Sequence, residues 1–318
     1  MGTSGKSEPG ESRGRSSESR VLLIDNDRPG GSLEQQLTSL HCPFTRAAGS
    51  ADALRQLRVT PYAVVVTDPD TSIREDLALV DEIRHLRPRV RVVLLAPGGT
   101  PEDLIATLRE RVFLCQCAPF NEKEIARYVV SAIEADNCAT GIEVLSADRS
   151  WISVRMHCDL LNADRLTAFF KQFQMTLPDH PPEEMMIAFE EILNNAIEHG
   201  AQNDPSKILE VAAVRTARAF VFYISDPGKG FRPDDIPHAA ISYAPDDLMS
   251  HIEVRNRSGM RPGGFGILMA SGIVDELIYS EVGNEVLLIK HMDALEDRRS
   301  SFEESSWVPS RSNDLMEC

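Results

Sequence analysis

The sequence predicts an α/β chain of two domains, a doubly wound domain followed by an α+β sandwich. With 318 residues, the chain is long enough for two domains with separate hydrophobic cores. Residues 20–135 alternate between short apolar strands and helices, which is typical of a parallel sheet covered on both faces. Residues 150–293 instead carry a strand, two helices and then consecutive strands. That order predicts an antiparallel or mixed sheet with helices on one face.

Composition restricts the class of protein. A formal net charge of −16 argues against general nucleic-acid binding and against anionic membrane surfaces. No apolar run reaches membrane-spanning length, and the N-terminus lacks the apolar core of a signal peptide. The six cysteines follow neither a zinc-binding nor a disulfide pattern, and Cys115 and Cys117 are predicted to be buried strand residues. We therefore expect a reduced, cytoplasmic protein.

The first domain follows a tail. Half of residues 1–20 are Gly or Ser, so residues 1–19 are expected to be disordered. The apolar runs predict strands at residues 21–24, 63–67, 91–95 and 112–115. Helices are predicted between and after them at residues 31–40, 50–58, 75–86, 101–110 and 121–135.

Acidic residues follow two of these strands. Asp25 and Asn26 come directly after the first strand, and Asp68 comes after the strand at 63–67. Ligands of parallel sheets gather at the carboxyl ends of the strands. Residues 20–135 thus resemble the flavodoxin-like receiver domain of two-component systems. The resemblance makes Asp68 the phosphoacceptor and places Asp25 and Asn26 at the acidic pair that binds magnesium.

Three positions depart from the receiver pattern. Asn26 stands where a second carboxylate is usual, Ala96 occupies the Ser/Thr switch position, and Ala118 replaces the lysine that pairs with the phosphoaspartate. Without that cation a new dianion lacks its main ordering contact. We favour a degenerate receiver retained for docking or dimerisation over a phosphorylation switch, with Asp68 as a residual acceptor.

A polar stretch at 136–149 is predicted to be a linker with the first strand of the second domain. A strand at 151–156 and a helix at 162–174, capped at Asn162, are expected next. Strands rich in Val, Ile, Phe and Tyr follow at 208–215 and 219–225.

The central element of the second domain is a predicted helix that ends near Gly200. Its apolar residues recur at helical spacing, and Gly200 is predicted to be its C-terminal cap. Glu191 and Asn195 are one turn apart, so they project from the same face. A carboxylate beside a carboxamide can serve as proton acceptor and magnesium ligand, although such a pair alone is more typical of an ordinary polar helix face.

Two glycine loops follow that helix. The first, at 226–230, reads Asp-Pro-Gly-Lys-Gly and comes directly after a strand. Its glycines allow close approach of a ligand, and Asp226 can accept a hydrogen bond from an exocyclic amine. The second, at 263–269, reads Gly-Gly-Phe-Gly-Ile-Leu-Met and opens a helix. Free amides and the helix dipole make such a turn a natural phosphate site.

With these three segments in this order, residues 142–292 resemble the GHKL ATPase superfamily. Residues 182–200 match its N-box, and 226–230 and 263–269 match its two glycine boxes. Within the superfamily, the compact N-box and the form of the second glycine box resemble most the anti-sigma-factor serine kinases.

This resemblance implies a role for each site residue. Glu191 would be the general base, and Asn195 would hold Mg²⁺ and contact ATP. Asp226 would receive the adenine amino group beside Gly228 and Gly230. The remaining residues would contact the phosphates: Gly263, Gly264 and Gly266 from the second glycine box, and Arg261 from a lid at 231–262. A solvent-exposed Arg261 is an equally good interpretation.

The resulting hypothesis is an ATP- and Mg²⁺-dependent protein serine/threonine kinase. By resemblance, it would phosphorylate a STAS-type antagonist, sequester a sigma factor and form a homodimer, with no direct contact to nucleic acid or membrane. The receiver-like domain would then regulate the kinase or bring it to a complex. A non-catalytic ATP-binding module that only sequesters partners is the first alternative. A histidine kinase of a phosphorelay is the second, with His157 or His180 as acceptor; neither has the neighbours of a phosphoacceptor motif. The residues 294–318 are predicted to be a disordered tail.

Overall fold

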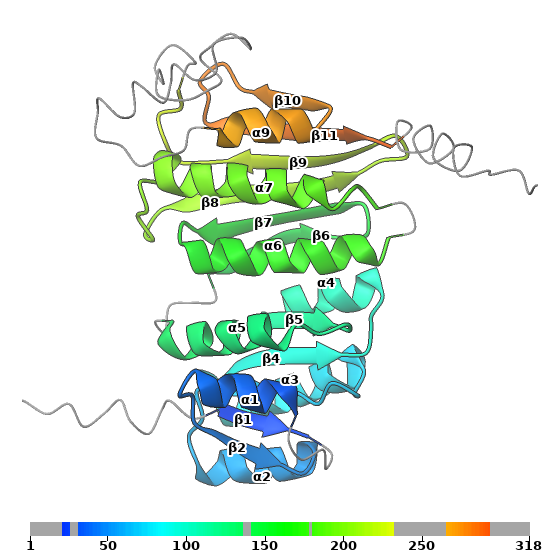
Figure 1. Cartoon of the computed structure of the whole chain (residues 1–318), viewed down its shortest axis with the longest axis vertical. Coiled ribbons are helices and arrows are strands. Elements are labelled where there is room, and N and C mark those ends of the chain that lie inside the picture. Colours follow the sequence, from blue (N-terminus) through cyan, green and yellow to red (C-terminus); the bar gives the residue numbers. More distant parts are fainter. Residues whose placement is uncertain (1–20, 26–30, 136–140, 178–179, 232–264, 293–318) are drawn as a thin grey trace, which may run out of the picture. The chain divides into compact units, whose positions relative to one another are not determined.

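The structure is a computed structural model that describes residues 21–25, 31–135, 141–177, 180–231 and 265–292 (Figure 1). The chain divides into two compact units, one of residues 1–148 with 155–177 and the other of residues 149–154 with 178–318. The two tails predicted to be disordered, and the lid from residue 232 onward, lie outside the described residues. The domain boundaries predicted from sequence stay predictions.

The first unit contains a five-stranded parallel sheet with the order β2-β1-β3-β4-β5. Its strands are β1 (Val21–Ile24), β2 (Phe44–Ala47), β3 (Val64–Val66), β4 (Arg91–Ala96) and β5 (Leu114–Cys117). This order is that of flavodoxin-like, receiver-type domains, so the predicted doubly wound fold is confirmed. The sequence did not predict β2, because this edge strand buries only Ala47 and has no continuous apolar run.

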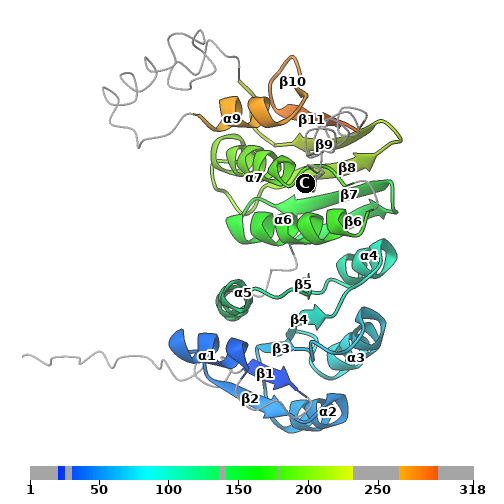
Figure 2. The same cartoon turned by 45° about the vertical axis from the view of Figure 1, so that its right-hand side comes forward.

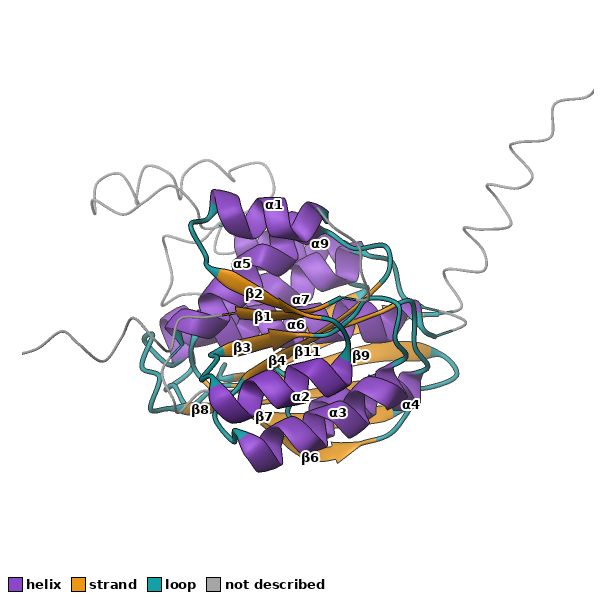
Figure 3. Ribbon diagram, turned by 90° about the horizontal axis from the view of Figure 1, so that it is seen from below, coloured by secondary structure: helices purple, strands orange, loops and turns teal. Residues whose placement is uncertain are grey.

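Five helices cover the two faces of this sheet: α1 (Ser32–Ser39), α2 (Ser50–Val59), α3 (Ile73–Leu86), α4 (Pro101–Arg109) and α5 (Glu122–Glu134). Figures 2 and 3 show α1 and α5 on one face and α2, α3 and α4 on the other. Ser72 caps α3 through a reciprocal capping box with Glu75, which explains why this helix starts before the predicted residue 75. Both faces of the central strands are therefore buried, as in β3, where all three valines are inaccessible.

Helix α6 (Leu160–Met175) also groups with the first unit. Its Ala168 belongs to the same buried cluster as Leu114 of β5 and Val129 of α5. The predicted cap at Asn162 is wrong. Asp159 is the N-cap, and its side chain accepts a hydrogen bond from the Asn162 backbone at 2.9 Å. Asn162 itself lies inside the first turn, where it is buried.

The second sheet has six strands in the order β10-β11-β9-β8-β7-β6. They are β6 (Ile142–Ala147), β7 (Trp151–His157), β8 (Ile208–Arg215), β9 (Ala219–Ser225), β10 (Glu276–Tyr279) and β11 (Glu285–His291). Strands β8, β9, β11 and β10 pair antiparallel. The register aligns Ala213, Phe222 and Leu288 across three strands, and all three are buried. The predicted α+β architecture is confirmed.

Two helices lie side by side on one face of β8–β11: α7 (Glu184–Asn195) and α9 (Gly266–Ile273) (Figures 1 and 2). Phe189 of α7 packs on Phe222 of β9, with ring centroids 4.2 Å apart. Because β9 buries alternate residues, one of its faces forms the core beneath these helices. This packing fixes the position of α7, which carries Glu191 and Asn195.

The end of α7 differs from the prediction. The helix continues as a π-turn, η1 (Ala196–Gly200), in which the Ala201 backbone N–H donates to the Ala196 carbonyl at 2.8 Å. Gly200 does not adopt the left-handed conformation of a capping glycine, so that prediction is wrong. A close neighbour from another segment explains the glycine instead, as described below. Such π-turns occur frequently at functional sites.

Candidate functional site

Three segments distant in the sequence meet in the second unit: the end of α7, the loop after β9 and the start of α9. Helices α7 and α9 approach each other closely at Gly266, the first residue of α9. A Cβ added there would overlap Glu191 Oε1 and lie 2.6 Å from Glu191 Cδ. Any larger residue at position 266 would displace the carboxylate, so Gly266 provides the space that Glu191 occupies.

Glu191 and Asn195 are both partly exposed, one turn apart on α7. Within the part of the chain that the structure describes, neither side chain makes a hydrogen bond or an ion pair. The carboxylate and the carboxamide are thus available to a ligand beside the start of α9. The helix places the two residues one turn apart, as their spacing predicted, and their roles as base and Mg²⁺ ligand stay predictions.

The second contact joins the π-turn to the loop after β9. A Cβ on Gly200 would lie 2.8 Å from the Asp226 Cβ and overlap its carboxyl group. A Cβ on Gly228 would lie 2.6 Å from Asp226 Oδ1 and 2.8 Å from the Gly200 carbonyl oxygen. Only glycine fits at positions 200 and 228, because Asp226 and the backbone of the other segment lie so close to them. The two glycines thereby fix the Asp226 carboxyl beside the π-turn that follows α7.

The Asp226 carboxyl is partly buried, and burial raises its pKa. The Gly228 backbone N–H, which donates to Oδ1 at 2.7 Å, and the nearby Lys207 charge oppose this rise. A fixed carboxylate at the rim of a glycine loop is suited to accept a hydrogen bond from an amine of a ligand.

The turn between β10 and β11 holds the same loop. The Asp226 backbone N–H donates to the Asn284 carbonyl at 2.9 Å, and Asn284 Nδ2 donates to the Asp226 carbonyl at 3.3 Å. Gly230 has a φ of +72°, and a Cβ there would overlap the Val282 carbonyl. Sequence reasoning missed Asn284, because its neighbour Gly283 signals a turn but not what that turn contacts.

Tyr279 of β10 is a further residue that the sequence did not single out. Its ring packs edge-on against Phe231, with centroids 5.0 Å apart. Burial, and then the charge of Asp226, raise the pKa of the Tyr279 hydroxyl. These aromatic rings border the loop that carries Asp226.

Several predicted site residues lie outside the described residues: Asn26, Arg261, Gly263 and Gly264. Their roles stay predictions. A magnesium site can still be tested against the residues present. In the described ranges, no group of three His, Cys, Asp or Glu side chains is arranged to hold a metal ion. Mg²⁺ bound to nucleotide phosphates needs only one or two protein oxygens, since phosphates and waters supply the rest, and Asn195 fits that requirement.

The receiver-like unit has its own acidic positions, at the carboxyl ends of β1 and β3. Asp68 is buried, and its Oδ1 accepts a hydrogen bond from the Asp70 backbone at 3.0 Å. Asp25 pairs with Arg46, whose Nη2 lies 2.5 Å from its Oδ2, and Arg46 Nε also contacts Glu34 at 2.8 Å. The carboxylate predicted to bind magnesium therefore already has a cationic partner.

No helix among the described residues is both long and apolar enough to cross a bilayer.

Comparison with known proteins gives matches to both halves of the chain. The family model of the histidine kinase-like ATPase domain matches residues 156–290. The anti-sigma F factor of Anoxybacillus flavithermus (strain DSM 21510 / WK1) is 32% identical over 130 residues, which are 40% of this chain and 80% of that protein. The transcriptional regulatory protein GlrR of Escherichia coli (strain K12) is 27% identical over 122 residues, 38% of this chain but only 27% of that regulator.

Solved structures match the receiver-like part. The receiver domain of NtrC4 from Aquifex aeolicus is 19% identical, with a TM-score of 0.32, and the match covers 36% of this chain and 97% of that one. A CheY-like receiver domain protein from Methanospirillum hungatei JF-1 is 18% identical, with a TM-score of 0.34, over 37% of this chain and 95% of that one.

Proposed function

The chain belongs to the family of the anti-sigma F factor through its histidine kinase-like ATPase domain, and we propose that it is an ATP- and Mg²⁺-dependent protein serine/threonine kinase. Its substrate would be a STAS-type antagonist protein, and its second partner a sigma factor that it sequesters. The observation that carries this proposal is the contact between Glu191 and Gly266. A domain that only binds nucleotide has no need to keep a carboxylate against the start of α9.

Asp226 would select the base of the nucleotide. Its carboxyl is fixed by Gly200 and Gly228, which leaves it in one orientation to accept a hydrogen bond from the adenine amino group. Gly228 and Gly230 would let the adenine edge approach the backbone. The amides at the start of α9, beginning with Gly266, would face the phosphates.

Glu191 would act as the general base. Its carboxylate would accept the proton from a substrate serine or threonine hydroxyl as that oxygen bonds to the γ-phosphorus, while the bond from the γ-phosphorus to the β–γ bridging oxygen breaks and ADP leaves. Asn195, one turn further along α7, would hold the Mg²⁺, which when bound neutralises charge on the phosphates. Because positioning and charge neutralisation supply most of the catalysis in phosphoryl transfer, one base and one amide ligand suffice.

The receiver-like unit would serve as a docking or dimerisation module rather than as a phosphorylation switch. The Asp25–Arg46 ion pair supports this reading, since a metal ion at Asp25 would first have to displace the guanidinium. Ala96 and Ala118 also lack the hydroxyl and the amine through which a phosphorylated Asp68 would act.

The alternatives differ in their phosphorylated product. His157 ends strand β7, and His180 lies in a connection before α7, so neither is on a helix of the kind that a histidine kinase uses for dimerisation. Sequestration without catalysis needs an intact nucleotide site but no base.

The experiment is transfer of the γ-phosphate from Mg-ATP to a STAS partner by the wild type, Glu191→Gln and Asn195→Ala. We expect acid-stable phosphoserine or phosphothreonine with the wild type and a loss of about 10²–10⁴-fold in rate with Glu191→Gln. Tight nucleotide binding without transfer would favour the sequestering module. Acid-labile label on the chain itself would overturn the proposal in favour of a phosphorelay.

A further inference from the structure

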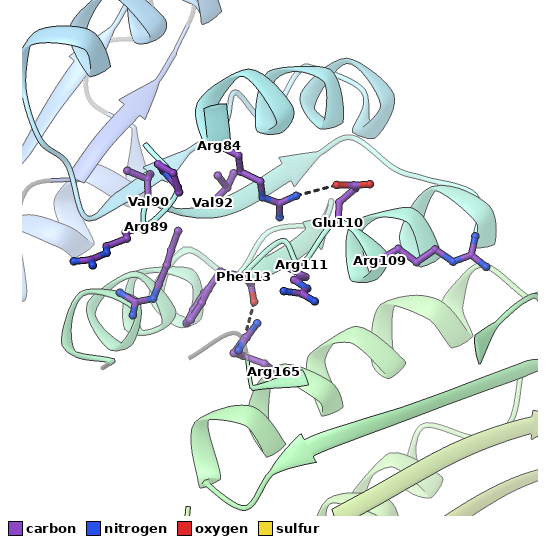
Figure 4. A pocket seen from close by; sticks show the side chains of 11 residues that line it. Arg84, Arg89, Val90, Val92, Arg109, Glu110, Arg111, Phe113 and Arg165 are labelled. Carbon is purple, nitrogen blue, oxygen red and sulfur yellow. Dashed lines mark hydrogen bonds and ion pairs between the residues drawn. The ribbon is translucent and has the colours of Figure 1, made fainter. Parts of the chain in front are cut away.

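A cavity of about 500 Å³ opens in the first unit, at the amino-terminal ends of β4 and β5 (Figure 4). Six of its lining residues are arginines: Arg84, Arg89, Arg91, Arg109, Arg111 and Arg165. Glu110 is the one acidic residue of the lining. This concentration of positive charge occurs in a chain whose formal net charge is −16. Clustered like charges repel one another unless an anion offsets them.

Arg165 is the buried member of the set, with 6% of its surface exposed. Its Nε donates to the Phe113 carbonyl at 2.8 Å and its Nη1 to Asn162 Oδ1 at 2.9 Å, both neutral oxygens. The guanidinium also lies 4.4 Å from the centroid of the Phe113 ring. Burial lowers the pKa of Arg165 to about 10; the nearby charge of Asp159 opposes this fall, and that of Arg91 adds to it. An anion in the cavity would relieve the cost of keeping this charge buried.

The side chains of Arg111 and Arg89 make no hydrogen bond or ion pair with the residues that the structure describes, and the Arg111 backbone N–H donates to the Leu108 carbonyl at 3.0 Å. Arg111 has a φ of +50°. It directly follows Glu110, the C-cap residue of α4, at a position where glycine is the usual residue. Glycine adopts this backbone conformation without strain, so Arg111→Gly removes the side chain with no cost to the backbone. In Figure 4, Arg84, Arg111 and Arg165 lie around the centre of the cavity, with Arg89 and Arg109 toward its two sides.

The remaining arginines are held by other groups. Arg84 Nη1 lies 2.8 Å from Glu110 Oε2, in a partly exposed ion pair. Arg91 donates to the Ala132 and Ala135 carbonyls at the end of α5, each at 2.7 Å. These contacts hold the guanidinium groups of Arg84 and Arg91 in place at the cavity wall. The cavity is thus formed in advance by the fold.

We propose that this cavity binds a small molecule that carries a chain of two or more phosphate groups. The planar guanidinium fork matches phosphate oxygens in pairs, and several converging arginines suit a chain of them. The volume lies in the range of sites for small ligands. Val90, Val92 and Phe113 also line the cavity, and apolar side chains of this kind would contact the nucleoside part of a nucleotide. The cavity lies at the amino-terminal ends of the strands, whereas Asp25 and Asp68 lie at their carboxyl ends. It is therefore separate from the proposed phosphoacceptor position.

The test is isothermal titration calorimetry of the full chain with inorganic triphosphate and with guanosine 5′-triphosphate. The variants are Arg111→Gly, which removes the side chain and relieves the backbone, and Asn195→Ala, which alters the proposed ATP site. We expect both the wild type and Asn195→Ala to bind, and Arg111→Gly to bind at least about tenfold more weakly while folding no less stably. Tighter binding of the nucleotide would identify a nucleotide ligand, and equal binding would identify the phosphates alone as the recognised group.

Two matched controls separate the ligand contact from general effects. His41→Gly makes the same backbone change at another left-handed position, His41 having a φ of +54°. Arg127→Gln removes a positive charge from an exposed position of α5 outside the cavity. Both should bind like the wild type. The proposal is overturned if neither the triphosphate nor the nucleotide binds. It is also overturned if binding is lost in Asn195→Ala but unchanged in Arg111→Gly. If hexaglutamate binds and neither phosphate probe does, the proposal is overturned and an acidic protein partner takes its place.

Discussion

Gly266 and Glu191 are in such close contact that a Cβ on Gly266 would overlap the Glu191 carboxylate, with Cγ only 2.9 Å away. The contact joins the first residue of α9 to the face of α7 that carries Asn195. It therefore couples the position of the proposed base to the helix whose amino end would face the phosphates. A substitution at Gly266 can therefore displace the Glu191 carboxylate while Glu191 itself stays unchanged.

Gly266→Ala is expected to lower the rate of phosphoryl transfer by about 10–100-fold, because misplacement of a catalytic group by about 1 Å has an effect of this size. The end of the Glu191 side chain is flexible, so the fold should persist. Gly272→Ala is the matched control, since a Cβ at Gly272 meets no atom within 4 Å. Single-turnover transfer assays with both variants check the prediction. Equal rates for the two variants would contradict it.

Gly200→Ala is expected to weaken ATP binding by about tenfold and to reduce the preference for ATP over GTP. The added Cβ would push the Asp226 carboxyl away from its position, and a misplaced acceptor no longer distinguishes an amine from a carbonyl on the base. Fluorescence titration with both nucleotides measures the two affinities. An unchanged affinity ratio would mean that Asp226 does not read the base.

Local sequence signals predicted most of the fold, because strand and helix periodicity are local properties. They failed at β2, whose four residues bury one side chain, and at the end of α7, where a glycine was interpreted as a cap. Gly200 is required by Asp226, which comes from another segment. That requirement depends on tertiary packing and leaves no local signature.

The candidate sites show the same division. The N-box and the glycine boxes could be located in the sequence because each is a contiguous motif, and the roles assigned to their residues stay predictions. The arginine-lined cavity could not, because Arg84, Arg111 and Arg165 follow no common spacing and converge only when α3, α4 and α6 pack together. Asn284 was missed for the same reason, since its contact with Asp226 joins two loops.

Stability of the first unit should decrease as the pH rises from about 4 to about 6. Burial raises the pKa of Asp76 to about 6, against hydrogen bonds from Thr67 and Thr71 that lower it. Between the unfolded value of 3.8 and about 6, the folded state keeps a proton that the unfolded state has lost, so raising the pH favours unfolding. The difference corresponds to roughly 3 kcal/mol.

Asp76→Asn should remove this part of the pH dependence, as measured by urea denaturation at a series of pH values. Asp81→Asn is the control, because the Asp81 side chain is 70% exposed. If the slope of stability against pH is the same in Asp76→Asn as in the wild type, Asp76 does not titrate in this range.

Lys290→Met is expected to destabilise the second unit by about 3 kcal/mol, because it removes one partner of a buried ion pair. The Lys290 side chain is 7% exposed, and its Nζ donates to the Ile273 carbonyl at 2.8 Å and to Asp275 Oδ1 at 2.9 Å. Ile273 is the last residue of α9, so Lys290 both satisfies a terminal carbonyl and complements the helix dipole. Loss of the lysine would leave the Asp275 carboxylate partly buried without its cation.

Two further variants test this explanation. Lys229→Met, at an exposed position, controls for the loss of one positive charge. Lys290→Met/Asp275→Asn should recover part of the lost stability, because the uncompensated charge is then gone. Urea denaturation of the three variants measures the free energies of unfolding. A Lys290→Met variant as stable as Lys229→Met would show that the end of α9 does not depend on this ion pair.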